Sequence, residues 1–229
     1  MIKHLACIMD GNRRWAKSHG WMTFKGHRQG AKTVELAIDF CLARGIAYLS
    51  LYTFSLENFK RSDEEKNYLF DLLVQESEKN IDFFIKKGIR ICFIGDRTLF
   101  PAAVLPTCEK VERETAHLNV LQVNFLFCYG ARQEIVTGVK NLMRQVREGT
   151  ISENDISDEN FHDYLWTRGI PDPEVIIRTG NIRRLSNFML YQAAYSELYF
   201  LECMWPELTE KHLEDVLVDF AHCRRNFGA

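Results

Sequence analysis

A carboxylate, an amide and two arginines stand together after a short apolar run near the N-terminus, as Asp10, Gly11, Asn12, Arg13 and Arg14. Asp10 offers oxygen ligands suited to Mg²⁺, which commonly binds one or two carboxylates together with substrate phosphates. The two arginines can hold phosphate oxygens through paired hydrogen bonds, and Gly11 lets the backbone approach an anion closely. The segment predicts an anion or Mg²⁺ site, although a surface turn of solvated charges explains it equally well.

Basic residues also surround His27, in the segment KGHRQG at 25–30. This segment stands just before a run with helical periodicity, and a helix N-terminus with basic residues attracts anions. It is a candidate phosphate site, with an ordinary surface histidine as the competing interpretation.

The segment FSLENFKRS at 54–62 joins an apolar run to a long helical pattern. Ser62 and Glu65 match a capping box, in which each side chain satisfies a free N–H at the start of a helix. Capping explains these two residues but does not explain Asn58 and Arg61, which therefore remain functional candidates.

A second arginine-rich segment, IRTGNIRRLSNF at 177–188, follows another apolar run. Arg178, Arg184 and Ser186 suggest a second phosphate site there, although Ser186 could instead cap the next helix. Glu197 is a candidate second metal ligand, for which an ordinary charge at a strand edge is the simpler explanation. Two anion sites and two candidate Mg²⁺ ligands suggest two phosphorylated substrates.

These residues need a scaffold, and apolar runs that alternate with amphipathic ones predict it. We expect strands at residues 4–9, 46–54, 89–95, 120–129, 175–178 and 198–201, and helices at 30–44, 63–88, 106–117, 133–147 and 210–223. The alternation predicts a single α/β domain over 1–229, with a mostly parallel six-stranded sheet covered by helices on both faces. Ligands bind beyond the C-terminal strand ends of such sheets, where Asp10, the segment 55–61 and Arg178 fall.

Several function classes are disfavoured. The formal net charge of −2 leaves no global basic field for nucleic acid, and no P-loop or GxGxxG motif indicates an ordinary nucleotide site. Seven cysteines without CxxC spacing argue against a disulfide framework or structural zinc and favour a reducing cytoplasm. The N-terminus predicts no signal peptide. No window approaches the roughly 20 apolar residues that span a bilayer.

In combination, these motifs resemble the cis-prenyltransferases, the family of undecaprenyl and dehydrodolichyl diphosphate synthases. The matching segments follow the family order along nearly the whole chain: HLACIMDGNRRW at 4–15, GHRQG at 26–30, FSLENFKRS at 54–62, FIGD at 93–96, IIRTG at 176–180, RRLSNF at 183–188, QAAYSELYF at 192–200 and WPEL at 205–208. No DDxxD-type aspartate run of the trans-type prenyltransferases occurs.

The resemblance implies a hydrophobic tunnel, Mg²⁺ as cofactor, a homodimer, and two substrates: isopentenyl diphosphate and an allylic diphosphate such as farnesyl or geranyl diphosphate. Asp10 is then the catalytic aspartate and Mg²⁺ ligand, Asn58 takes part in proton removal, and Glu197, from this chain or a partner subunit, completes the metal site. A lipid product would have to leave from a soluble enzyme or from one that touches a membrane only peripherally. The implied substrate-binding residues are Gly11, Asn12, Arg13, Arg14, Trp15 and His27 for the allylic diphosphate, Ser55, Leu56, Glu57, Phe59 and Arg61 beside the substrates, and Arg178, Arg184, Leu185 and Ser186 for isopentenyl diphosphate.

The chain departs from the family pattern at phosphate-handling positions. Thr23 replaces an arginine, Asn181 and Ile182 replace a glycine and a glutamate, and Asn226 replaces the arginine of a C-terminal R-x-G motif. Nearby Lys25, Arg183 and Arg225 could compensate in part. The departures bear on substrate preference and turnover more than on family membership.

Two alternatives remain open at this point. One is an irregular, cyclising or short-chain prenyl diphosphate synthase on the same fold. The other is a non-catalytic partner subunit, against which the retained Asp10, Asn58 and Glu197 argue. The long helix at 63–88 has no extra turn and Phe127 replaces smaller residues, so we expect a medium or shortened product. Apolar residues would wall the product cleft, or simply form core: Leu69, Phe70, Leu72, Leu73, Phe84, Leu121, Val123, Phe125 and Phe127.

Overall fold

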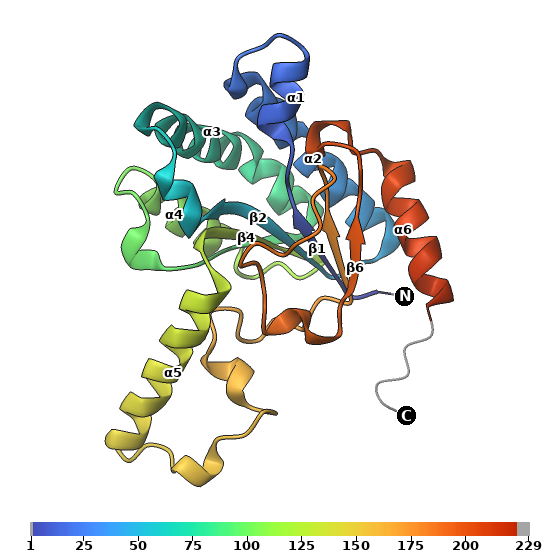
Figure 1. Ribbon diagram of the computed structural model, residues 1–229. Coiled ribbons are helices and arrows are strands. Elements are labelled where there is room, and N and C mark those ends of the chain that lie inside the picture. Colours follow the sequence, from blue (N-terminus) through green and yellow to red (C-terminus); the bar gives the residue numbers. More distant parts are fainter. Residues whose placement is uncertain (1, 224–229) are drawn as a thin grey trace.

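The computed structural model describes residues 2–223, and its centre is a single parallel sheet (Figure 1). The described strands are β1 (His4–Ile8), β2 (Tyr48–Ser55), β3 (Ile89–Ile94), β4 (Leu121–Tyr129), β5 (Val175–Arg178) and β6 (Glu197–Phe200). Their order is β3-β4-β2-β1-β5-β6, and every pair is parallel. The predicted α/β fold with a six-stranded sheet is confirmed.

Strand β1 shows why the sheet is covered on both faces. Successive side chains of a strand point to opposite faces, so Leu5 and Cys7 enter the larger apolar core while Ala6 and Ile8 enter a smaller one. All four side chains are buried. A strand that is apolar throughout is typical of a central strand in a parallel sheet.

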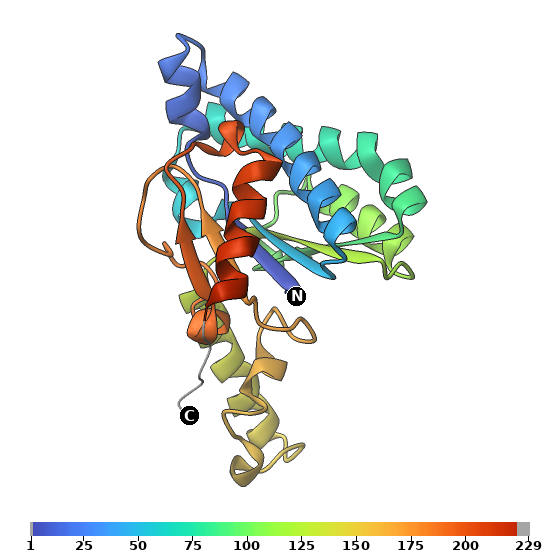
Figure 2. The ribbon, with the colours of Figure 1, turned by 90° about the vertical axis from the view of Figure 1, so that its right-hand side faces the viewer.

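The helices divide unequally between the two faces. They are α1 (Asn12–Ser18), α2 (Thr23–Arg44), α3 (Asp63–Lys87), α4 (Leu105–Thr115), α5 (Ala131–Arg147) and α6 (Glu210–His222). Side chains of α2, α3, α4 and α6 belong to the larger core, and Ala131 of α5 belongs to the smaller one. In Figures 1 and 2, α1 projects at one end of the molecule, and α5 extends away from the sheet at the other.

Helix α2 begins seven residues before the predicted Gly30, so the segment 25–30 is not a loop in front of a helix but its first two turns. Two glycines of this segment have a packing role. A Cβ at Gly26 would overlap the carbonyl oxygen of Asn12, and one at Gly30 would overlap the Asn12 side chain. These glycines let α1 and α2 approach closely, and the prediction that the helix begins at Gly30 is wrong.

The start of α3 differs from the predicted capping box in one half. The Ser62 hydroxyl accepts a hydrogen bond from the Glu65 backbone N–H at 3.4 Å, as expected. The Glu65 carboxylate does not return to the Ser62 backbone, because it is buried among basic side chains.

Candidate active site

Parallel strands bring the predicted site residues to one edge of the sheet. The register pairs Ile8 of β1 with Arg178 of β5, so Asp10, two residues beyond β1, lies beside the end of β5. Strand β2 ends nearby at Ser55 and continues into the 3₁₀ helix η1 (Leu56–Lys60). The carboxyl ends of β1, β2 and β5 thus bring the candidate site residues together, at the edge where parallel sheets commonly bind ligands.

Asp10 is held firmly while its carboxylate stays accessible. Arg178 Nη2 donates to Asp10 Oδ2 at 2.9 Å, and Arg14 Nη2 lies 3.4 Å from Oδ1. The Thr179 hydroxyl donates to the Asp10 carbonyl oxygen at 2.7 Å and accepts from the Asp10 N–H at 3.1 Å. The Asp10 side chain is 31% exposed. Ion pairs and backbone bonds therefore fix a carboxylate that still faces solvent.

The residue after Asp10 must be glycine. Gly11 has φ of +109°, in the region that L side chains rarely adopt. A Cβ there would also lie 2.7 Å from the Cβ of Met204. Gly11 turns the chain from β1 into α1, and so it places Arg13 and Arg14 beside Asp10.

Arg178 links Asp10 to the loop that follows β5. Its side chain is buried, and Nη1 donates to Ser186 Oγ at 2.7 Å and to the Arg184 carbonyl oxygen. Arg184 Nε donates to the same Ser186 oxygen at 3.2 Å. Ser186 has φ of +52° and no helix starts there, so the alternative that Ser186 caps a helix is wrong. Its hydroxyl instead accepts hydrogen bonds from the guanidinium groups of Arg178 and Arg184.

Glu65 contacts three of the predicted site residues, and the sequence did not reveal it. Its Oε1 accepts from Arg61 Nη1 at 3.1 Å and lies 3.2 Å from His27 Nε2 and 3.7 Å from Arg13 Nε. Burial lowers the pKa of His27, against the opposing effect of the hydrogen bond to Glu65. Burial also lowers the pKa of Arg61, and the Glu65 charge opposes that shift. The spacing of four residues between Arg61 and Glu65 was the available signal, because it predicts an ion pair on a helix.

The segment after β2 is ordered by its own polar side chains. Asn58 Oδ1 accepts from the Ser55 N–H at 3.2 Å, which closes the start of η1. Glu57 Oε1 accepts from Asn187 Nδ2 at 3.0 Å. The second bond ties the segment after β2, which carries Arg61, to the loop after β5, which carries Arg184.

Two polar clefts meet at Asp10. One, of about 920 Å³, is lined by Asp10, Asn12, His27, Ser55, Glu57, Asn58, Arg61, Arg178, Leu185 and Ser186 among others. The other, of about 780 Å³, is lined by Asp10, Gly11, Asn12, Arg13, Arg14, His27 and Arg61 among others. Both clefts contain arginines, and Asp10 lies on the wall that they share.

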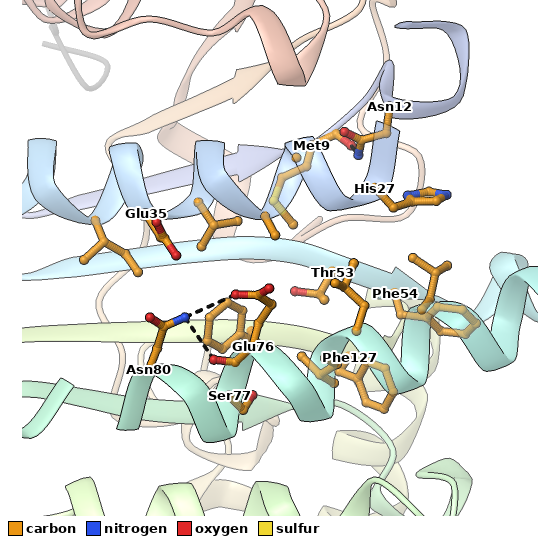
Figure 3. Close-up of a pocket in the computed structure, with 18 of the residues that line it drawn as sticks. Met9, Asn12, His27, Glu35, Thr53, Phe54, Glu76, Ser77, Asn80 and Phe127 are labelled. Atoms are coloured by element: carbon orange, nitrogen blue, oxygen red, sulfur yellow. Dashed lines mark hydrogen bonds between the residues drawn. The ribbon is translucent and has the colours of Figure 1, made fainter. Parts of the chain in front are cut away.

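A third cavity, of about 140 Å³, lies between the sheet, α2 and α3 (Figure 3). Met9, Asn12 and His27 line it as well as both polar clefts, so all three spaces meet at these side chains. In Figure 3, Asn12 and His27 lie at one end of the cavity, and Glu35 and Asn80 lie at the other. Six residues of the predicted apolar wall line this cavity: Leu69, Leu72, Leu73, Phe84, Phe125 and Phe127. Phe70, Leu121 and Val123 do not line it and pack in the core instead.

Some predicted site residues do not line either polar cleft. Trp15 packs against His19 and Trp21. Leu56 and Phe59 pack against the larger core. Arg184 contacts Arg178 through its carbonyl oxygen and Ser186 through its side chain, without lining either cleft.

Glu197 lies at the wrong end of the sheet to share a metal with Asp10 of the same chain. It is the first residue of β6 and pairs with Val175, the first residue of β5, whereas Arg178 beside Asp10 is the last. Three residues of strand correspond to about 10 Å. The prediction that Glu197 of the same chain completes the metal site is therefore wrong, and only the version that takes Glu197 from a second copy of the chain remains.

The departures from the family pattern have local explanations. Asn181 has φ of +54°, which asparagine tolerates better than most residues, so it keeps the turn that a glycine would make. Lys25 lies 5.1 Å over the Trp21 ring and does not line a polar cleft, so it does not replace the arginine missing at Thr23. Asn226 and Arg225 lie outside the described residues.

The donor set fits a Mg²⁺ ion that arrives with a diphosphate. Within residues 2–223, no cluster of three or more His, Cys, Asp or Glu side chains forms a preformed metal cage. Asp10 nevertheless presents a partly exposed carboxylate at the junction of two arginine-lined clefts. One carboxylate together with substrate phosphates is a common arrangement for Mg²⁺.

Comparisons with known proteins agree with this geometry. The family model described as "Putative undecaprenyl diphosphate synthase" matches residues 8–228. The isoprenyl transferase of Clostridium perfringens is 42% identical, over all of this chain and 90% of that protein. A probable undecaprenyl diphosphate synthase from Campylobacter jejuni has a TM-score of 0.83 and 34% identity, over 100% of this chain and 99% of that one.

A second solved structure is more similar in shape. Lavandulyl diphosphate synthase from Lavandula x intermedia, in complex with dimethylallyl diphosphate, has a TM-score of 0.96 and 28% identity, over 100% of this chain and 98% of that one. The chain therefore belongs to the isoprenyl transferase family of cis-prenyltransferases, and it is a prenyl-transferring enzyme.

Proposed function

We propose that the protein joins isopentenyl diphosphate to an allylic diphosphate in a Mg²⁺-dependent reaction that yields a cis-polyprenyl diphosphate. The observation that carries this proposal is the meeting of two arginine-lined clefts at Asp10, beside an apolar cavity. Two clefts suit two diphosphates, and the cavity suits a hydrocarbon chain.

The two clefts take different substrates in this account. The cleft lined by Gly11, Arg13 and Arg14 holds the allylic diphosphate, because its floor is the turn between β1 and α1 where backbone and guanidinium donors converge. The cleft lined by Arg178 and Ser186 holds isopentenyl diphosphate. Asp10 lies between them and would hold Mg²⁺, which supplies neutralisation of diphosphate charge when bound.

The reaction breaks one bond and makes another. The allylic C–O bond breaks and the diphosphate leaves with the bonding electrons. The terminal double-bond carbon of isopentenyl diphosphate bonds to the allylic carbon, and a proton leaves the new chain to restore a double bond. Arg13, Arg14 and Arg61 stabilise the negative charge that grows on the leaving group, and the apolar cavity keeps water from the cationic carbon.

Asn58 acts by orientation in this scheme. A neutral amide is not a base near neutral pH, and Asn58 Oδ1 is already bonded to the Ser55 N–H. We assign Asn58 the role of holding the segment after β2 against the substrates during proton loss.

The assembly and location that we propose rest on surface and core residues. Val136, Val139 and Met143 are 53%, 42% and 52% exposed at helical spacing on α5, which supports a homodimer whose second copy brings Glu197 toward the metal site. All seven cysteines are free, which supports a reducing cytoplasm. None of the helices within residues 2–223 is long and apolar enough to cross a bilayer. A polyprenyl product would therefore pass to a membrane by peripheral contact.

The test is a product analysis. The purified protein is incubated with Mg²⁺, labelled isopentenyl diphosphate and, in separate reactions, dimethylallyl, geranyl or farnesyl diphosphate. The proposal predicts labelled prenyl diphosphates that require both a primer and Mg²⁺. Absence of label in any product, with every primer, would contradict it.

A second candidate is the coupling of allylic diphosphates with each other. It is favoured by the TM-score of 0.96 to a lavandulyl diphosphate synthase bound to dimethylallyl diphosphate, and by a cavity of only about 140 Å³. A cavity of similar size, about 150 Å³, holds a six-carbon benzene ring, so this one takes about one five-carbon unit. Product formed from dimethylallyl diphosphate alone would establish this activity.

A further inference from the structure

The end of the molecule formed by residues 13–25, here called the α1–α2 tip, exposes large apolar side chains. Figures 1 and 2 show that it projects from the body. Trp21 is 44% exposed and Met22 is 67% exposed. Neither belongs to either apolar core, so folding of the chain alone does not explain them.

The exposed tryptophan is held in place. Its ring lies 5.3 Å from the Trp15 ring and 5.1 Å from the His19 ring, with which it is stacked. Lys25 Nζ lies over the Trp21 ring, 5.1 Å from the ring centre. A rigid aromatic side chain contributes contact area without a large loss of conformational entropy when it binds.

The tip and the adjoining start of α2 are strongly basic. Residues 11–34 contain six Lys or Arg residues and no Asp or Glu, whereas the whole chain has a formal net charge of −2. Arg13 and Arg14 are engaged with Glu65 and Asp10. The other four basic residues of this stretch are exposed: Lys17, Lys25, Arg28 and Lys32.

We propose that the α1–α2 tip docks on an anionic lipid bilayer, with Trp21 and Met22 inserted among the headgroups. Tryptophan concentrates at membrane interfaces because its ring is apolar and its N–H is polar. Exposed lysines and arginines next to it are attracted by anionic lipids. A soluble polyanion such as nucleic acid would satisfy the charges but would leave Trp21 and Met22 uncovered.

The position of the tip relates this surface to the proposed function. Trp21 and Met22 line the same cleft as Asp10 and Arg13. Docking through the tip therefore places the mouth of that cleft at the bilayer, where a hydrocarbon product can leave without crossing water. The binding itself needs no substrate, so it can be tested whatever the reaction proves to be.

The experiment is sedimentation of the whole protein with vesicles, either of phosphatidylcholine alone or of equal parts phosphatidylglycerol and phosphatidylcholine. We expect binding to the anionic vesicles and little to the neutral ones. The double variant Trp21→Ser/Met22→Ser should lose at least about tenfold in partition coefficient. Lys17→Ser/Lys25→Ser should lose on the order of tenfold or more, because each lysine near an anionic surface contributes about a fivefold factor.

Matched controls lie far from the tip. Val120→Ser removes an apolar side chain that is 59% exposed just before β4, at the opposite end of the sheet. Lys110→Ser removes an exposed lysine of α4. Both controls should bind like the original protein. Circular dichroism identifies any variant that fails to fold, and for such a case Trp21→Gln is the replacement.

The proposal is overturned if the original protein does not sediment with anionic vesicles, if the tip variants bind unchanged, or if the controls lose as much binding as the tip variants. Equal binding of the protein and of Trp21→Ser/Met22→Ser to soluble heparin, without vesicle binding, would assign the basic surface to a polyanion instead.

Discussion

The polar groups at the two ends of the sheet differ in charge and in hydrogen bonding. Toward the N-terminal end, a chain of neutral groups crosses the sheet: His4 Nε2 is 2.8 Å from Ser50 Oγ, Asn124 Nδ2 donates to that oxygen at 3.1 Å, and Gln122 Nε2 donates to Asn124 Oδ1 at 2.8 Å. His4 Nδ1 is 2.6 Å from the Pro171 carbonyl oxygen. Burial lowers the pKa of His4 to about 4, so the network is uncharged near neutral pH.

At the carboxyl end, the groups are charged and incompletely paired. Asp10, Arg61 and Arg178 line open clefts, and the buried atoms Asn12 Oδ1 and Arg178 Nε have no hydrogen-bond partner in the protein. Buried polar groups are normally satisfied, because an unpaired one costs about 1 to 3 kcal/mol. The difference indicates that the N-terminal network stabilises the fold, whereas the carboxyl end keeps donors and acceptors for ligands.

The largest effect is expected at Asp10. Asp10→Asn removes the carboxylate charge at the junction of the clefts while keeping its shape. We expect turnover to fall on the order of a thousandfold, the loss typical of one electrostatic group that acts on the transition state. We also expect the melting temperature to fall, because buried Arg178 loses its counter-charge. Steady-state rates and a melting curve measure both. A variant that keeps more than a tenth of the original rate would contradict the view that the polar groups at the carboxyl end of the sheet serve ligands.

Phe127→Ala tests the wall of the apolar cavity. Phe127 is buried and its ring centre lies 4.9 Å from that of Phe100 and 5.6 Å from that of Phe54. Truncation should cost about 3 to 4 kcal/mol in the free energy of unfolding and should lengthen the products separated by chromatography. Unchanged product length would remove Phe127 from the control of chain length.

Glu65→Gln tests the missed carboxylate. Arg13, His27 and Arg61 would then crowd together without a counter-charge, and we expect a loss of about 1 to 3 kcal/mol in the free energy of unfolding. Denaturant unfolding measures the change. Glu64→Gln, on the neighbouring exposed position, is the control and should cost less than about 0.5 kcal/mol. Equal losses in the free energy of unfolding would show that the Glu65 carboxylate stabilises the fold no more than an exposed one does.

The pH dependence of stability should carry the signature of His4. Its folded pKa of about 4 lies below the ordinary value of 6.5, so the unfolded chain takes up the proton first as pH falls. The contribution of neutral His4 to the free energy of unfolding is fully present above pH 6.5 and is lost as pH falls toward 4. The free energy of unfolding should fall by about 2 kcal/mol between pH 7.5 and pH 5. Unfolding curves at these pH values, compared with His4→Gln, measure the difference. A variant with the same pH slope as the original would contradict the assignment.

Site residues that follow directly after buried strands could be predicted from the sequence. Asp10, Ser55 and Arg178 follow buried strands, and the rule for parallel sheets places them together. Glu65 was missed because a capping box already explained its presence. Only the folded structure shows that its buried carboxylate faces Arg13, His27 and Arg61. Glu197 was misplaced because the register of β6 against β5 comes from tertiary packing, which a single sequence does not display.

The start of α2 was mispredicted in a segment that contains two glycines. Gly26 and Gly30 serve the close approach of α1, a contact that the local pattern does not show. Ser186 illustrates the same limit, since its positive φ and its two guanidinium partners depend on the whole loop after β5.

The most direct test of the account is a comparison of Michaelis constants in two variants, one for each cleft. Arg14→Gln should raise KM for the allylic diphosphate about tenfold and leave KM for isopentenyl diphosphate nearly unchanged, since a charge-assisted bond contributes about 1.5 kcal/mol or more. Ser186→Ala should do the reverse, because Ser186 positions Arg178 and Arg184. Equal shifts in both constants for both variants would contradict the claim that the two clefts are separate diphosphate sites.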